Sequence, residues 1–164
     1  MEELTFKLAT FEDYDDFYYI KCDPENVIWS GFPSVPDYDR MKEWFQQQLE
    51  GKKRTIYLSQ WNGRVSGFFY LDNIALRGTD TTAQEISYGV LSEFTGKGIG
   101  TAIVQKAIQI CNTSQIVAWV SEKNRASERC FEKNGFEKQQ KRELRYMTSS
   151  QEFHYFYFWT KKIR

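Results

Sequence analysis

The sequence predicts one α/β domain in which a central mixed β-sheet of about seven strands is flanked by about four helices. Three observations lead to this fold class. The chain has 164 residues, the usual length of one domain, so we expect residues 1–164 to form a single unit. β-rich and helix-periodic segments follow one another in the order β-α-α-β-β-β-α-β-α-β-β. Aromatic residues make up 17% of the chain, enough bulky side chains for a large core.

The first quarter of the chain predicts one strand and two helices. Leu4–Leu8 alternates between apolar and polar residues, as a strand does. Thr10 is expected to cap a helix. The opening turns of that helix are rich in Asp and Glu, which the positive end of the helix dipole favours. The segment from Asp23 to Pro36 holds all three prolines and is expected to be a loop. A second helix with apolar residues at helical spacing should end at Gly51.

The middle of the chain predicts a β-hairpin and a further strand. Thr55–Leu58 and Val65–Leu71 are β-rich, and Asn62-Gly63 lies between them. Asn-Gly favours a tight hairpin turn because both residues tolerate a positive φ. Glu85–Leu91 is the next expected strand.

The last third predicts the remaining elements. After a helix that opens at a glycine-dense turn come a strand at Gln115–Val120 and a short helix at Arg125–Lys133. Gly135 stands where that helix should end with a left-handed residue. The final two strands are expected at about Glu143–Met147 and Phe153–Thr160.

Composition excludes several classes of partner and site. Lys and Arg (22) balance Asp and Glu (22), which argues against partners that need a positive field, so we expect neither nucleic acid nor a membrane as partner. No apolar run of about 18 residues and no secretion signal occur, so a cytoplasmic protein is expected. Three scattered cysteines and a single histidine, His154, predict no metal site. His154 and the aromatic run around it are expected to be structural.

The glycine-dense turn Gly96-Lys97-Gly98-Ile99-Gly100 predicts a phosphate site. The first backbone N–H groups of a helix have no partner within it, and glycines let a phosphate approach them. The P-loop pattern fails because Lys97 is followed by glycine, and the dinucleotide pattern fails because the third glycine comes one residue early.

Two stretches of the chain resemble the two signatures of the GNAT N-acetyltransferase superfamily. Val90–Ala102 is similar to a strand end followed by [RQ]-x-x-G-x-[GA], although Thr95 stands where the family has Arg or Gln. Asn124–Phe136 is similar to N-x-x-[AS]-x-x-x-[YF]-E-K-x-G-F. The family's order of elements agrees over nearly the whole chain, and Glu85–Val90 looks like the branch that contains ribosomal-protein N-acetyltransferases.

The resemblance implies acetyl-CoA as the acetyl donor and assigns residues to it. Backbone amides of the glycine turn would hold the pyrophosphate, from Gly96, Lys97, Gly98, Ile99, Gly100 and Thr101. The pantetheine arm would pair with Val90, Leu91 and Ser92 on one side and contact Asn124, Ser127 and Phe131 on the other. The N–H of Val90 would polarise the acetyl carbonyl, which is the task of a fixed donor at a developing oxyanion.

The same resemblance implies a base and an acid. Glu85 occupies the strand that often carries the base, although a solvated strand end explains it as well. The family's usual acid is a tyrosine at the position of Phe131, which has no hydroxyl. Ser127 is the first substitute and Tyr88 the second, whereas Cys130 is expected to face the core.

Several hypotheses about the function and the oligomeric state stay open. Trp29 and Phe32, in the expected loop, are predicted to contact the acceptor, a small molecule or peptide: a peptide N-terminus, a polyamine or an amino sugar. A CoA-binding module without turnover is the alternative to an enzyme. Binding of single-stranded nucleic acid through the aromatic strand is a third hypothesis, and both a monomer and a homodimer are compatible with the sequence.

Overall fold

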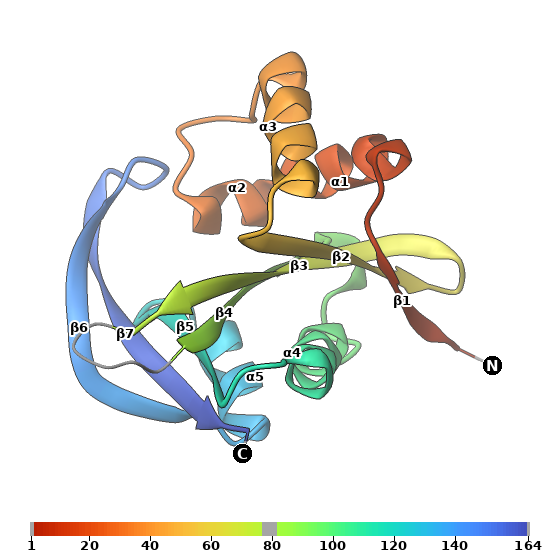
Figure 1. Ribbon diagram of the computed structural model, residues 1–164. Coiled ribbons are helices and arrows are strands. Elements are labelled where there is room, and N and C mark those ends of the chain that lie inside the picture. Colours follow the sequence, from red (N-terminus) through yellow and green to blue (C-terminus); the bar gives the residue numbers. More distant parts are fainter. Residues whose placement is uncertain (1, 77–81, 164) are drawn as a thin grey trace.

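The computed structural model describes residues 2–76 and 82–163, and its described strands form one seven-stranded sheet (Figure 1). The strands lie in the order β1-β2-β3-β4-β5-β7-β6, and neighbours are antiparallel except for β4 and β5, which are parallel. The strands are β1 (Leu4–Leu8), β2 (Arg54–Trp61), β3 (Arg64–Ala75), β4 (Thr82–Val90), β5 (Gln115–Ser121), β6 (Glu137–Met147) and β7 (Glu152–Lys162). The mixed α/β fold predicted from the sequence is confirmed.

Helices cover both faces of this sheet (Figure 1). One face carries α1 (Tyr14–Lys21), α2 (Pro24–Ser30) and α3 (Tyr38–Glu50), and the other carries α4 (Ile99–Ile110) and α5 (Arg125–Lys133). No helix within the described ranges is long and apolar enough to cross a membrane.

Helix α2 corrects the prediction of a loop from Asp23 to Pro36. Pro24 stands in the first turn of the helix, where its missing N–H costs nothing, and Gly31 ends the helix at φ +78°. The same residue types that suggested a loop are therefore the start and stop signals of a short helix. The described chain has five α-helices instead of the expected four.

The predicted turns agree with the structure, whereas several strands are longer than expected, β6 most of all. Asn62 and Gly63 have φ of 51° and 82° in the β2–β3 turn, and Gly135 has φ 81° after α5. β6 begins at Glu137, six residues before the expected start. Polar side chains dominate that extension, so hydrophobic alternation did not reveal it.

The core between α1, α3 and the sheet is an aromatic cluster. The buried Phe17 ring lies 4.7 Å from the Phe45 ring and 5.7 Å from the Phe68 ring, measured between centroids. On β7, His154 is buried, with its Nδ1 3.1 Å from the hydroxyl oxygen of Ser121, which agrees with a structural role.

We expect Phe17→Ala to lower the free energy of unfolding by about 3–5 kcal/mol, because it empties the centre of this cluster. The matched control Phe153→Ala removes a ring that is 61% exposed, and should cost less than about 1 kcal/mol. Denaturant unfolding of both variants measures the difference; equal losses would contradict the assignment of this core.

Candidate active site

The site begins where β4 and β5 separate. The two strands pair only at Gln84↔Ile116 and Glu85↔Val117. The N–H of Leu91 donates to the carbonyl of Ser66 on β3 at 2.8 Å. Because successive residues of an extended chain point their backbone groups to opposite edges, the N–H of Val90 faces the gap toward β5. An extended amide chain can add to such an edge.

The glycine turn lies at the end of this gap. Gly96 and Gly98 have φ of 79° and 78°, which only glycine adopts readily, and a Cβ on either would meet no atom within 4 Å. The first hydrogen bond at the start of α4 runs from the N–H of Ala102 to Gly98. The amides of residues 99–101 therefore precede it and are available to an anion.

A cavity of about 270 Å³ lies between this turn and α5. Eight of the predicted cofactor residues line it: Val90, Gly96, Gly98, Ile99, Gly100, Thr101, Asn124 and Ser127. The structure brings these residues together from β4, the turn and α5, which are far apart in the sequence.

Four other predicted cofactor residues do not line this cavity. Leu91 is buried in the core, and Phe131 is buried against Phe136 and Tyr88. The ammonium of Lys97 lies over the Trp61 ring, 5.8 Å from its centroid. Ser92, the fourth, is hydrogen-bonded to Asp23.

The buried Asp23 holds Ser92. Its Oδ1 accepts the Ser92 N–H at 2.8 Å and its Oδ2 accepts the Ser92 hydroxyl at 2.6 Å. Both donors of Ser92 are thus occupied and unavailable to a cofactor. The pair ties the residue before α2 to the residues that follow β4. Sequence reasoning missed it, since the two residues are 69 positions apart and carry no shared motif.

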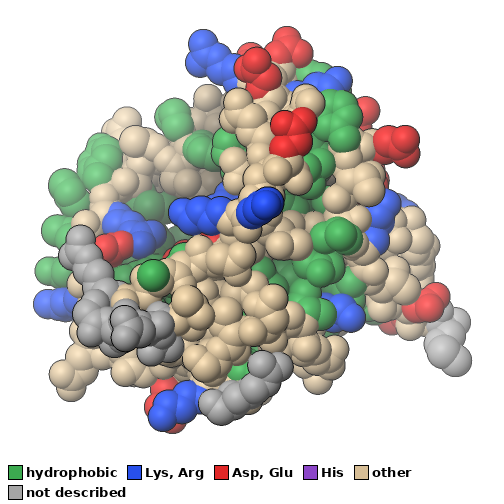
Figure 2. Space-filling model, in the orientation of Figure 1, with side chains coloured by type: hydrophobic (Ala, Val, Ile, Leu, Met, Phe, Trp, Pro, Cys, Tyr) green, Lys and Arg blue, Asp and Glu red, His purple; other side chains and the backbone are tan. Residues whose placement is uncertain are grey.

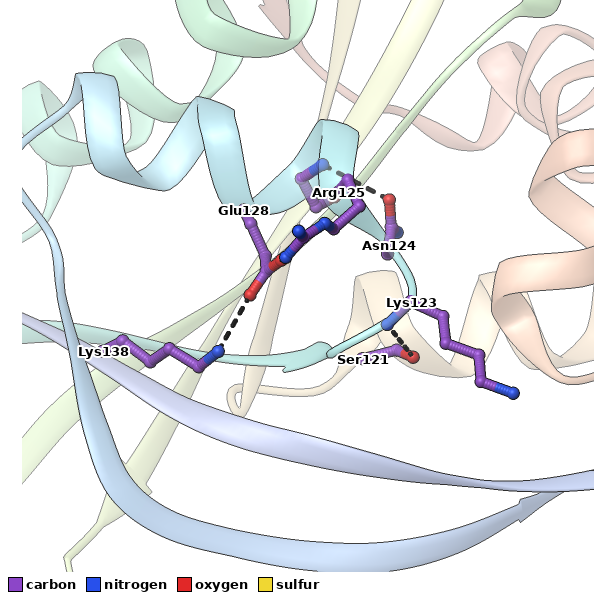
Figure 3. Close-up of polar contacts among 7 residues, drawn as sticks. Ser121, Lys123, Asn124, Arg125, Glu128 and Lys138 are labelled. Atoms are coloured by element: carbon purple, nitrogen blue, oxygen red, sulfur yellow. Dashed lines mark hydrogen bonds and ion pairs between the residues drawn. The ribbon is translucent and has the colours of Figure 1, made fainter.

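Helix α5 is fixed at its start by three polar contacts (Figure 3). The side-chain oxygen of Asn124 accepts the N–H of Ser127 at 3.3 Å, which caps the helix. The buried carboxylate of Glu128 accepts from Arg125 at 3.2 Å and from Lys138 on β6 at 3.1 Å. These contacts fix the first turn of the helix, and with it the backbone of Ser127, beside the cavity.

Tyr88 reaches the same place from β4. Its Oη lies 3.0 Å from the Oγ of Ser127, and its ring packs edge-on against Phe131 at 5.9 Å. Burial raises the pKa of Tyr88, and the neighbouring Cys130 raises it further, so the phenol is protonated at neutral pH. A Cβ on Gly100 would approach the Tyr88 ring to 3.4 Å and the Cys130 Sγ to 3.1 Å, which leaves little room for a side chain there.

Cys130 packs against the main core, as expected, but one side of it also faces the cavity. It is half-buried and lines the 270 Å³ cavity. Its sulfur lies 3.6 Å from the Thr101 hydroxyl.

A larger cavity of about 810 Å³ lies beneath α1–α3. The two predicted acceptor residues, Trp29 and Phe32, both line it. Trp29, Asn26 and Tyr88 line both this cavity and the smaller one, so the two spaces adjoin at these three residues. Asn26, which sequence reasoning missed, donates to the carbonyls of Ile20 at 3.0 Å and Val90 at 3.3 Å.

Glu85 lies in a third space of about 200 Å³, between β4 and β5, which Trp29, Tyr88 and Ser127 also line. Burial raises the pKa of Glu85, and the charge of Asp72, its partner on β3, raises it further. Asp72 is in turn bound by both Nε and Nη2 of Arg54, at 2.6 and 2.7 Å. A carboxylate with a raised pKa, in a space that shares Trp29 and Tyr88 with both other cavities, is a candidate general base.

No group of three or more His, Cys, Asp and Glu side chains that could hold a metal ion occurs in residues 2–76 and 82–163.

Comparison with known proteins places this geometry among related folds. Residues 3–137 match the family model described as "Acetyltransferase (GNAT) domain". The chain is 30% identical over 139 residues to "Putative phosphinothricin acetyltransferase YwnH" of Bacillus subtilis, a match that covers 81% of this chain and 83% of that protein.

Two solved structures illustrate how far the fold is shared. The spermidine N-acetyltransferase of Vibrio cholerae, in complex with CoA and spermine, superposes with a TM-score of 0.82 at 13% identity and covers 97% of this chain and 95% of its own. The ribosomal-protein-alanine N-acetyltransferase of Brucella melitensis gives 0.80 at 19% identity, covering 96% of this chain and 99% of its own.

We expect Asp23→Ala to lower the free energy of unfolding by about 2–4 kcal/mol, because a buried N–H and hydroxyl lose a charged acceptor. The Ser92 amide should also exchange its hydrogen faster. Ser92→Ala, which removes only the hydroxyl bond, should cost less. The exposed Asp39→Ala is the matched control; if Asp23→Ala behaves like it in unfolding and exchange, the link between α2 and β4 is not structural.

Proposed function

The chain belongs to the acetyltransferase (GNAT) family, and from this premise we propose that it transfers the acetyl group of acetyl-CoA to a primary amine by direct attack. One observation carries the proposal: the unpaired end of β4 faces a glycine turn at a helix start and adjoins a large second cavity. That arrangement offers one space to the cofactor and another to the acceptor. We also propose a cytoplasmic location, where the free thiols of Cys22, Cys111 and Cys130 stay reduced.

The cofactor would lie along the gap between β4 and β5. Amides of residues 96–101 would bind its pyrophosphate, and its pantetheine arm would add to the β4 edge. The Val90 N–H, which faces this gap, would donate to the thioester oxygen and stabilise the negative charge that develops there. Asn124 and Ser127 would contact the arm from α5.

The reaction then needs one base and one acid. An amine with a pKa of about 10.4 is protonated at neutral pH and must lose a proton before it attacks the carbonyl carbon. Glu85 would accept that proton, directly or through a water. When the C–S bond breaks, the thiolate would take a proton from Tyr88. The Ser127 hydroxyl, which is hydrogen-bonded to Tyr88, would then pass a proton from solvent back to Tyr88. Tyr88 would thus replace the hydroxyl that Phe131 lacks.

Release of free thiol from acetyl-CoA in the presence of an amine library tests the proposal, with calorimetric binding of CoA measured in parallel. We expect CoA to bind and at least one amine to stimulate release. If CoA binds, no amine stimulates release and Glu85→Gln with Ser127→Ala changes nothing, the chain is a CoA-binding module without turnover.

We expect Glu85→Gln to lower kcat by about 100-fold, the usual contribution of a general base. The raised pKa means that the wild-type carboxylate is protonated up to a higher pH than an ordinary glutamate. Wild-type activity should therefore rise with pH through that raised pKa, and the variant should lose this acidic limb. The exposed Glu137→Gln is the control and should keep the wild-type profile; an unchanged limb in Glu85→Gln would assign the base elsewhere.

We expect Tyr88→Phe and Ser127→Ala each to lower kcat by about 10- to 100-fold with a smaller effect on KM, since both remove part of one proton path. The double variant should be little worse than the worse single variant, because the two hydroxyls act together. The exposed Tyr146→Phe is the control. Fully additive losses would show that the two residues act independently.

A further inference from the structure

Lys21, the last residue of α1, is a buried ammonium group without an acidic partner in the described structure. It is 7% exposed and lines the 810 Å³ cavity. Its one polar contact is the hydroxyl of Ser30, at 3.4 Å. No ion pair joins it to a carboxylate among the described residues, and the nearby charge of Arg54 has the same sign. Burial lowers the pKa of Lys21 to about 8, so at neutral pH most molecules still carry the charge.

Aromatic rings surround this ammonium and partly stabilise it. Its Nζ lies 4.9 Å from the centroid of the Phe68 ring, 5.6 Å from Phe32 and 5.8 Å from Tyr70. The hydroxyl of Tyr70, which lines the same cavity, is buried and has no hydrogen-bond partner. The ammonium of Lys21 has one long hydrogen bond and no counter-charge, so a polar ligand in this cavity would complete its contacts.

The other charged residues that line the cavity indicate that the ligand is negatively charged. Arg54 is already neutralised by Asp72, and Arg40 adds a further positive charge at the cavity. Asp37 is the one carboxylate among the described lining residues; it is exposed and accepts the backbone N–H of Arg40 as the cap of α3. Figure 2 shows Lys and Arg side chains across the middle of one face, between the helices and the sheet.

Lys21 also lies close to the end of β4. The Phe68 ring beneath it belongs to the β3 residue that pairs with Gly89, the neighbour of Val90. Asn26 links the two regions, because its amide donates to the carbonyl of Ile20, the residue before Lys21, at 3.0 Å and to the carbonyl of Val90 at 3.3 Å. An acceptor in the 810 Å³ cavity would lie between Lys21 and the end of β4.

We propose that the acceptor is a small, amino acid-like molecule whose carboxylate binds Lys21 while its amine faces the thioester. The proposal rests on the acetyltransferase function above and narrows its substrate class. A carboxylate supplies the counter-charge that the protein itself does not provide. Polyamines and aminoglycosides would instead bring further positive charge against Lys21 and Arg40, which is unfavourable in a buried space.

Matched pairs of acceptors test the role of the carboxylate. Each L-amino acid is assayed beside its own carboxamide, with spermidine as a polycation. We expect wild-type kcat/KM to favour the acid of the best pair by at least 10-fold. Lys21→Met should bring the ratio close to 1 by raising KM for the acid alone. Lys21→Arg should keep part of the preference, and the exposed Lys162→Met should match the wild type.

Two further measurements separate this proposal from its premise. The free energy of unfolding of Lys21→Met should equal or exceed that of the wild type, because the variant replaces an unpaired buried charge with an apolar side chain. Calorimetric binding of the same acid and amide pairs requires no turnover, so it decides the acceptor class even if no amine is acetylated. A preference for amides or spermidine, or an unchanged ratio in a folded Lys21→Met, would overturn the proposal.

Discussion

The early end of pairing between β4 and β5 is the constraint on which the site depends. Backbone groups that leave a sheet need other partners when they are buried, and the structure supplies them from α2 and the residue before it. Asn26 binds the Val90 carbonyl, and Asp23 binds the amide and hydroxyl of Ser92. These contacts hold the end of β4 in its extended form, so the strand edge toward β5 stays open to another extended chain. Helix α2 is therefore part of the site as well as of the fold.

Successive residues of a strand face opposite sides of the sheet, so the end of β4 contacts both helical layers. Tyr88 projects toward α4 and α5, where it meets Ser127, whereas the next residue faces the layer of α1–α3. That next residue is Gly89, and a Cβ there would come within 2.7 Å of both Asn26 and Phe68. The close approach brings the helical layer down onto the strand end. The proposed cofactor and acceptor spaces meet there because consecutive residues of one strand face opposite sides of the sheet.

The sequence predicted the features that depend on neighbouring residues. Asn62-Gly63, Gly135 and the start of α4 at the glycine turn follow from backbone preferences that a few residues determine. It failed where distant segments decide the outcome. The bond between Asp23 and Ser92 spans 69 positions. Nothing near Lys21 in the sequence shows that it is buried against rings from β3. Helix α2 was missed for a different reason: Pro24 and Gly31 serve equally well in a loop and at the two ends of a helix.

A formally neutral chain can hold an anionic cofactor and an anionic acceptor because both candidate sites use local charge. Backbone amides at the start of α4 carry partial charges that do not enter the net charge. Lys21 is one ion among 44 charged residues, but burial shields it from solvent and salt, so its field acts more strongly over a short range than that of exposed lysines. The cost of burying it unpaired lowers the stability of the empty protein. A bound anion would remove that cost, so the feature that destabilises the free chain would strengthen binding of the proposed acceptor.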